Sequence, residues 1–166
     1  MKTLILLRHG KSDWSGDVPD RERPINERGR RAAMRMAMWM KREALVPDHM
    51  LVSSATRTRE TAVHLRSALG DLAADVAQVP LDALYLADPG VVLETVRTKG
   101  KGETLLVLGH NPGLETAAVK LTRGVRCPPA MPTCTAAVLR FAVRSWGDVG
   151  WGEGMLVHHV APKSLD

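Results

Sequence analysis

The stretch Leu4-Ile5-Leu6-Leu7-Arg8-His9-Gly10 lies near the N-terminus and changes abruptly from apolar to polar. Four consecutive aliphatic residues predict a strand that is buried on both faces of a parallel sheet. In open α/β sheets, ligands bind outside the carboxyl ends of the strands, which is where Arg8 and His9 follow. Gly10 permits a sharp exit of the chain and a close approach of its backbone to a ligand. The stretch therefore predicts a buried strand that presents an arginine and a histidine to a substrate.

Strand-like apolar runs alternate with helical periodicity along the rest of the chain. Asn26 is a candidate N-cap of a helix whose apolar positions recur every three to four residues, and Gly70 is a candidate stop signal for the next helix. We expect helices over 26–44, 56–69, 89–97 and from Pro112 with Asn111 as its cap, and further strands over 49–52, 76–86, 104–108, 136–143 and 155–160, the last two forming an edge hairpin. This order predicts one domain spanning residues 1–166, with a three-layer α/β/α fold, a mostly parallel sheet and helices on both faces.

Composition is that of an ordinary globular protein. The chain has 166 residues, 45% of them hydrophobic, and its N-terminal apolar run is too short for a signal peptide or a membrane span, which favours a cytoplasmic location. Cys127 and Cys134 lack a metal-binding spacing and are expected to be free thiols. His158 and His159 cannot chelate one ion, because neighbouring side chains on a strand point to opposite faces. We therefore expect neither a metal nor a cofactor.

The net charge of +5 suits an anionic ligand, and many of the basic residues fall between Arg21 and Arg42. Nucleic acid is an unlikely partner, because the chain has six aromatic residues to stack on bases and no helix-turn-helix or zinc-finger pattern. The solvated face of a basic helix explains most of these arginines.

Three predicted strands end in polar signatures that should meet at one edge of the sheet. These are Arg8-His9-Gly10, Ser53-Ser54 followed by Arg57 in the next helical turn, and Gly109-His110-Asn111. The fixed fork of an arginine matches phosphate oxygens, so two converging arginines indicate a bound phosphoryl group. A histidine among them could accept that group covalently.

These three signatures resemble those of the histidine phosphatase superfamily, which is also called phosphoglycerate-mutase-like. The short length, the opening Arg8-His9-Gly10-Lys11-Ser12-Asp13-Trp14 and the segment Arg23-Pro24-Ile25-Asn26-Glu27-Arg28-Gly29 are similar to the compact SixA-type phosphohistidine phosphatases. The similarity runs in order along nearly the whole chain.

The resemblance implies that His9 is the nucleophile and that Arg8, Arg57 and His110 hold the phosphoryl oxygens. This fits the chemistry, because a phosphoryl group in transit spreads negative charge over three oxygens. A neighbouring phosphate should raise the pKa of His110, whereas His9 must be neutral to attack. We expect the far ring nitrogen of His9 to bond to a backbone carbonyl near Gly10, which would fix the tautomer.

Many members of the superfamily also use a carboxylic acid to protonate the leaving group. Asp82 and Asp88 are the candidates, and Asp82 is favoured because Asp88 has a competing role as an N-cap. Candidate substrate contacts at the rim of the site are Lys11, Ser12, Arg23 and Arg59.

The predicted activity is therefore that of a phosphatase acting through phospho-His9 on phosphohistidine in a protein. The same chemistry on a small phosphate ester is the first alternative, and a phosphoglycerate mutase is less favoured because the chain lacks room for enclosing insertions. From a different class, the chain could be a non-catalytic module that binds phosphate or nucleic acid. A neutral nucleophile beside the arginines argues against that reading.

Overall fold

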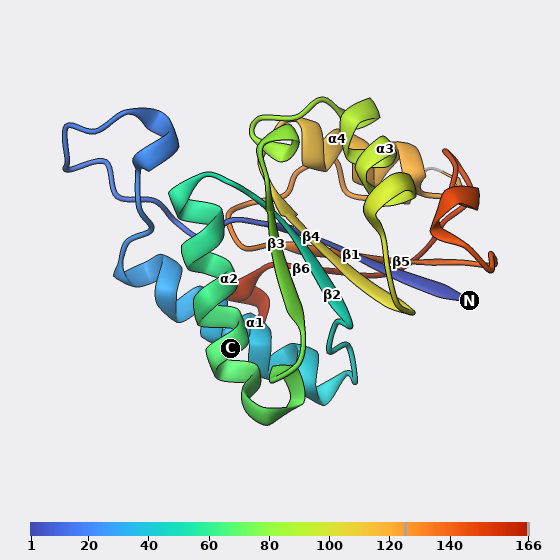
Figure 1. The fold of residues 1–166 in the computed structure, drawn as a ribbon, viewed down its shortest axis with the longest axis horizontal. Helices are drawn as coiled ribbons and strands as arrows, with labels where there is room; N and C mark the ends of the chain where they lie inside the picture. The colour runs from blue at the N-terminus through green and yellow to red at the C-terminus, as the bar shows by residue number, and fades with distance from the viewer. Residues whose placement is uncertain (125, 166) are drawn as a thin grey trace.

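The computed structural model describes residues 1–124 and 126–165, which fold around one six-stranded sheet (Figure 1). The strand order is β3-β2-β4-β1-β5-β6. The strands are β1 (Lys2–Arg8), β2 (His49–Ser53), β3 (Ala77–Leu81), β4 (Thr104–Gly109), β5 (Ala136–Phe141) and β6 (Met155–Val160). Three of the five pairings are parallel, while β5 runs antiparallel to both β1 and β6. The sheet is therefore mostly parallel, as predicted, with the expected hairpin at one edge.

Helices cover both faces of this sheet, which confirms the predicted three-layer α/β fold. Figure 1 shows α1 (Glu27–Arg42) and α2 (Thr56–Leu69) on one face, and α3 (Pro89–Lys99) and α4 (Gly113–Leu121) on the other. Successive residues of β1 contribute to opposite cores: Leu4 and Leu6 pack with α3 and α4, whereas Ile5 and Leu7 pack with α1 and α2. The aliphatic run is thus buried on both sides, and none of the described helices is long and apolar enough to cross a membrane.

The register of β1 with β4 sets the position of the polar residues that follow them. Arg8 lies opposite Gly109 in this parallel pair, so His9 and His110 leave the sheet at the same level. On its other side, β4 pairs with β2, whose last residue is Ser53. The carboxyl ends of three adjacent strands consequently meet at one edge of the sheet.

The helix signals were largely correct. Asn26 caps α1 by accepting a hydrogen bond from the backbone N–H of Gly29, and Gly70 ends α2 with a φ of 63°. The expected cap at Asn111 was wrong: α4 begins at Gly113, and the Asn111 side chain instead donates to Glu115 and to the Met131 carbonyl.

Several predicted boundaries also differ from the structure, as three examples show. α1 ends at Arg42, because the chain turns at Ala44 with a φ of 54° instead of continuing the helix. β5 ends at Phe141, two residues before the predicted Val143. β3 ends at Leu81, so Asp82 begins a short 3-10 turn after the strand and does not lie inside it.

Candidate functional site

His9 is buried just beyond β1 and is held in one tautomer. Its Nδ1 donates a 2.7 Å hydrogen bond to the Gly10 carbonyl oxygen, as the sequence predicted. The carbonyl can only accept, so Nδ1 carries the proton and the neutral ring presents an unprotonated Nε2. Burial, reinforced by the charges of Arg57 and Arg8, lowers the pKa of His9 to about 4. His9 is therefore neutral and oriented at neutral pH, which is the state that a nucleophilic imidazole requires.

The turn that carries His9 is locked against the helices beneath it. The Gly10 N–H donates to the Thr61 hydroxyl of α2 at 3.0 Å. A Cβ atom at Gly10 would lie 2.9 Å from the carbonyl oxygen of Gly29 in α1, which is too close for any other residue. The glycine is thus required for packing of backbone against backbone, a reason that the sequence did not reveal.

His110 faces His9 across the site, with 5.3 Å between the two ring centroids. Its Nε2 lies 2.7 Å from the Ser53 hydroxyl at the end of β2, and the Tyr85 ring meets it edge-on. Burial and the charge of Arg57 lower the pKa of His110 to about 3. Its buried Nδ1 has no hydrogen-bond partner among the described residues. A phosphoryl oxygen could accept a hydrogen bond from this atom.

Two predicted arginines flank the histidines. Arg57 lies in the first turn of α2 with 3% of its side chain exposed, and it donates to the backbone oxygen and the carboxylate of Asp20. Arg8 donates from Nη1 to the Met131 carbonyl at 3.1 Å. The Nε atoms of both arginines are buried without a partner among the described residues. Buried cationic donors of this kind suit an anionic ligand.

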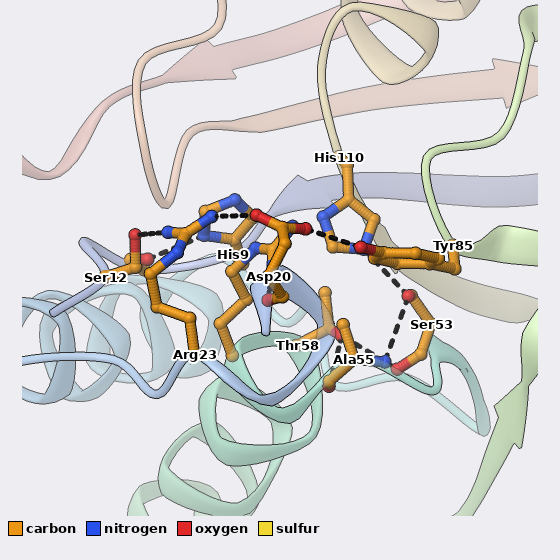
Figure 2. Close-up of polar contacts among 11 residues, drawn as sticks. His9, Ser12, Asp20, Arg23, Ser53, Ala55, Thr58, Tyr85 and His110 are labelled. Carbon is orange, nitrogen blue, oxygen red and sulfur yellow. Dashed lines mark hydrogen bonds and ion pairs between the residues drawn. The ribbon is translucent and has the colours of Figure 1, made fainter. Parts of the chain in front are cut away.

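Asp20 is the acidic residue of the site that sequence reasoning missed, and Tyr85, which bonds to it, was missed as well. The Asp20 carboxylate accepts from Arg23 at 2.5 Å and from the Tyr85 hydroxyl at 2.5 Å (Figure 2). It also accepts from Arg57 at 3.0 Å. The bonds from Tyr85, Arg23 and Arg57 hold the pKa of Asp20 well below its usual range. No local pattern marked Asp20, because it sits in a polar loop with several similar acids. The arginines that predict a phosphate site thus hold a carboxylate in this structure.

Of the four predicted rim residues, three line one cavity and Arg59 does not; the three are Lys11, Ser12 and Arg23. Arg23 is buried: its guanidinium donates to the Ser12 hydroxyl and stacks 3.6 Å above the Trp14 ring. Lys11 is exposed and lines the same cavity. Arg59 lies outside it and donates to the Ser54 carbonyl.

One cavity of about 450 Å³ joins these groups. It is lined by Arg8, His9, Lys11, Ser12, Trp14, Asp20, Arg23, Arg57, Leu86, His110, Asn111 and Thr133. A neutral imidazole surrounded by three guanidinium groups can attack an anionic electrophile whose charge the arginines stabilise.

Neither candidate acid lines this cavity. The Asp82 carboxylate is paired with Arg21, and its side chain is 82% exposed. Bonding to Ser54 and the charge of Arg21 lower the pKa of Asp82, which is the opposite of what a proton donor needs. Asp88 occupies the N-cap position of α3 without a side-chain capping bond.

The described part of the chain offers no cluster of metal ligands and no exposed thiol. No group of three or more His, Cys, Asp or Glu residues there could hold a metal ion. Cys127 and Cys134 are buried free thiols, and burial raises the pKa of Cys134 to about 12.

Comparison with known proteins agrees with this geometry. The sequence model of the histidine phosphatase superfamily (branch 1) matches residues 4–81. The uncharacterized protein Rv1276c of Mycobacterium tuberculosis is 32% identical over 95% of this chain and 100% of its own length. The chain belongs to the histidine phosphatase superfamily, which confirms the resemblance read from its motifs.

Solved structures place it more narrowly. A proposed phosphohistidine phosphatase SixA from Nakamurella multipartitia is 26% identical, with a TM-score of 0.79 over 97% of this chain and 96% of that one. The protein histidine phosphatase SixA complexed with tungstate shares the fold at 23% identity, with a TM-score of 0.79 over 99% of both chains. Within the superfamily, this chain is of the SixA type.

Proposed function

We propose that this protein is a phosphatase that removes the phosphoryl group from phosphohistidine in another protein. His9 is the nucleophile, and Arg8, Arg57 and His110 bind the phosphoryl oxygens. The observation that carries the proposal is the His9 ring itself, neutral and fixed by Gly10, with buried guanidinium groups beside it.

In the first step, His9 Nε2 forms a bond to phosphorus while the bond from phosphorus to the substrate imidazole breaks. The phosphorylated His9 ring keeps its Nδ1 proton and becomes cationic, and the Gly10 carbonyl stabilises this charge. In the second step, water attacks phosphorus, and His9 leaves as the neutral ring with which the cycle began. Phosphate and a proton are released.

Charge stabilisation falls to the residues around the nucleophile. The guanidinium groups of Arg8 and Arg57 donate hydrogen bonds to the equatorial oxygens and stabilise their negative charge. His110 offers its unpartnered Nδ1 to the same group. The charge of the bound phosphoryl group raises the pKa of His110, so that the ring is protonated when the group is bound.

The nature of the leaving group favours phosphohistidine over an aliphatic phosphate ester. Asp20 is the one acidic side chain among the described residues of the cavity, and its low pKa keeps it ionised. Departing imidazole has a conjugate acid with a pKa of about 6.5, against about 15.7 for water as a guide to an alcohol. A substrate imidazole that is already protonated leaves as a neutral ring without help from the enzyme.

The phosphoenzyme is the direct test. The protein is mixed with a phosphoramidate or acetyl phosphate donor, quenched, and its intact mass is measured. We expect an acid-labile gain of about 80 Da in wild type, the mass of one phosphoryl group on histidine. The gain should be absent from His9→Ala, which should lose at least about a thousandfold in turnover. His64→Ala, a change outside the cavity, should retain both.

Other outcomes point to the alternatives. A gain that persists in His9→Ala would remove His9 as the nucleophile. No gain in wild type, together with no phosphate release, would favour a module that binds phosphate without turning it over. A higher kcat/KM for p-nitrophenyl phosphate than for a phosphohistidine peptide would favour small esters as substrates.

A further inference from the structure

A second hollow, with a volume of about 350 Å³, opens beside the catalytic cavity. We call it the basic hollow, and it is lined by Lys11, Arg28, Arg31, Ala32, Arg35, Pro132, Thr133, Ala161, Pro162 and Lys163. Half of these side chains are cationic, and none of the described lining residues is acidic. They come from α1, the loops after β1 and before β5, and the segment that follows β6.

The basic hollow and the catalytic cavity share a border. Lys11 and Thr133 line both, so the two spaces adjoin at these residues. Lys11 lies two residues after His9 in the sequence, which places the hollow next to the nucleophile. A ligand that is longer than one phosphoryl group could therefore extend from the catalytic cavity towards the hollow.

Four of the five cations of the hollow face solvent, namely Lys11, Arg28, Arg31 and Lys163. Lys11, Arg28 and Lys163 are exposed and form no ion pair with another described residue. Arg31 lies 3.9 Å from Glu27, but that carboxylate bonds more closely to Arg30, at 2.7 Å. Cations gathered around one concavity, whose described lining residues include no carboxylate, produce a field that attracts an anion.

We propose that the basic hollow binds acidic side chains of the phosphoprotein segment whose phosphohistidine occupies the catalytic cavity. The inference rests on the proposed function and adds a sequence preference to it. A single phosphoimidazole does not need both spaces, whereas an extended peptide advances about 3.3 Å per residue and reaches from one to the other. Nucleic acid fits less well, because no aromatic side chain lines the hollow to stack on bases.

Binding can be measured without turnover in a His9→Ala background. The probes are two short phosphohistidine peptides that differ at the neighbouring positions, which are Asp in one and Asn in the other. The test variant adds Arg28→Gln and Arg31→Gln, which remove two charges but keep long polar side chains. The matched control adds Arg42→Gln and Lys99→Gln, which remove the same charge from exposed positions outside both cavities.

In the His9→Ala background we expect the Asp peptide to bind about tenfold more tightly than the Asn peptide, about 1.4 kcal/mol. The preference should fall below about threefold in the Arg28→Gln/Arg31→Gln variant, persist in the control and weaken with added salt. With His9 restored, the same pair should leave kcat and KM for p-nitrophenyl phosphate unchanged within about twofold, because exposed charges outside the catalytic cavity contribute little to its chemistry.

Three results would overturn the inference: no preference for the Asp peptide, an equal loss in the control, or a preference that survives Arg28→Gln/Arg31→Gln. If pyrophosphate displaced both peptides equally, and this displacement required Arg28 and Arg31, the ligand of the basic hollow would be a small polyanion and not an acidic peptide. Failure of the proposed function would give a different pattern of results. The Asp preference would then be present in binding, while wild type would release no phosphate from either peptide.

Discussion

The ends of the strands and the loop between β1 and α1 build the two halves of the catalytic cavity in different ways. His9 and His110 follow strands whose register is fixed, and they lie at one level because Arg8 pairs with Gly109. Asp20 and Arg23 come from a long loop and reach the cavity through side-chain bonds to Arg57, Tyr85 and Ser12.

The difference shows which half of the cavity can be predicted from local sequence patterns. Strand-end residues are positioned by the backbone hydrogen bonds of the sheet, so their neighbours in space follow from the strand order. The loop residues are positioned by contacts with one another and with the site that they help to form. The strand ends supply His9, the proposed nucleophile, while the loop supplies the Asp20 carboxylate that bonds to Arg57 and Arg23.

Replacing Arg57, the residue at which the two halves meet, should have the largest effect. Arg57→Ala removes a buried guanidinium from the proposed phosphoryl site and leaves the Asp20 carboxylate with one fewer cation. We expect kcat/KM to fall by about a hundred- to a thousandfold, in the range measured for lost oxyanion donors. Arg59→Ala, in the same helix but outside the cavity, is the control. A loss below about threefold would exclude Arg57 from the site.

The strand-end histidines should titrate far below an ordinary histidine. An NMR titration is expected to give pKa values of about 4 for His9 and about 3 for His110. Because both values lie below 6.5, the unfolded chain binds more protons than the native one between pH 6.5 and 4, so stability falls as the pH falls through this window. Inorganic phosphate should raise the pKa of His110. A ring that titrates near 6.5 in the free protein would contradict the buried geometry.

The loop half can be tested through Asp20. Its carboxylate competes with phosphate for Arg57 and Arg23, so Asp20→Asn should tighten binding of inorganic phosphate. We expect about a fivefold lower Kd by calorimetry, a modest gain because the Asp20 side chain is 44% exposed. Asp17→Asn, in the same loop, should change nothing. Weaker binding in Asp20→Asn would mean that the carboxylate orients the arginines instead of competing for them.

Asp82 should give the smallest effect, because its exposed carboxylate pairs with Arg21 outside the cavity. We expect Asp82→Asn to lower the rate on a phosphohistidine peptide by less than about twofold, the range of an exposed ion pair. Asp88→Asn serves as a comparison at the N-cap of α3. A much greater loss for an aliphatic phosphate ester than for phosphohistidine would restore Asp82 as the leaving-group acid.

The position of Asp82 shows where prediction from strand ends stops. β3 ends at the same edge of the sheet as β1, but the order β3-β2-β4-β1 separates the two by three strand spacings, or about 14 Å. Arg57 lies nearer, because β2 is closer to β1 and its helix carries a long side chain inward. The sequence indicated which residues follow strands, but the strand order decided which of them share a cavity.

By itself, the sequence determined the α/β layers, the strand that carries Arg8 and His9, the second histidine after β4, the anchor of His9 on Gly10 and the family of the protein. These features depend on local apolar patterns, on residues adjacent to strand ends and on short motifs. Tertiary structure alone decided that Asp20 and Tyr85 join the site, that Arg23 is buried and that Asp82 remains outside. Those outcomes depend on contacts between segments far apart in the chain, which no local pattern encodes.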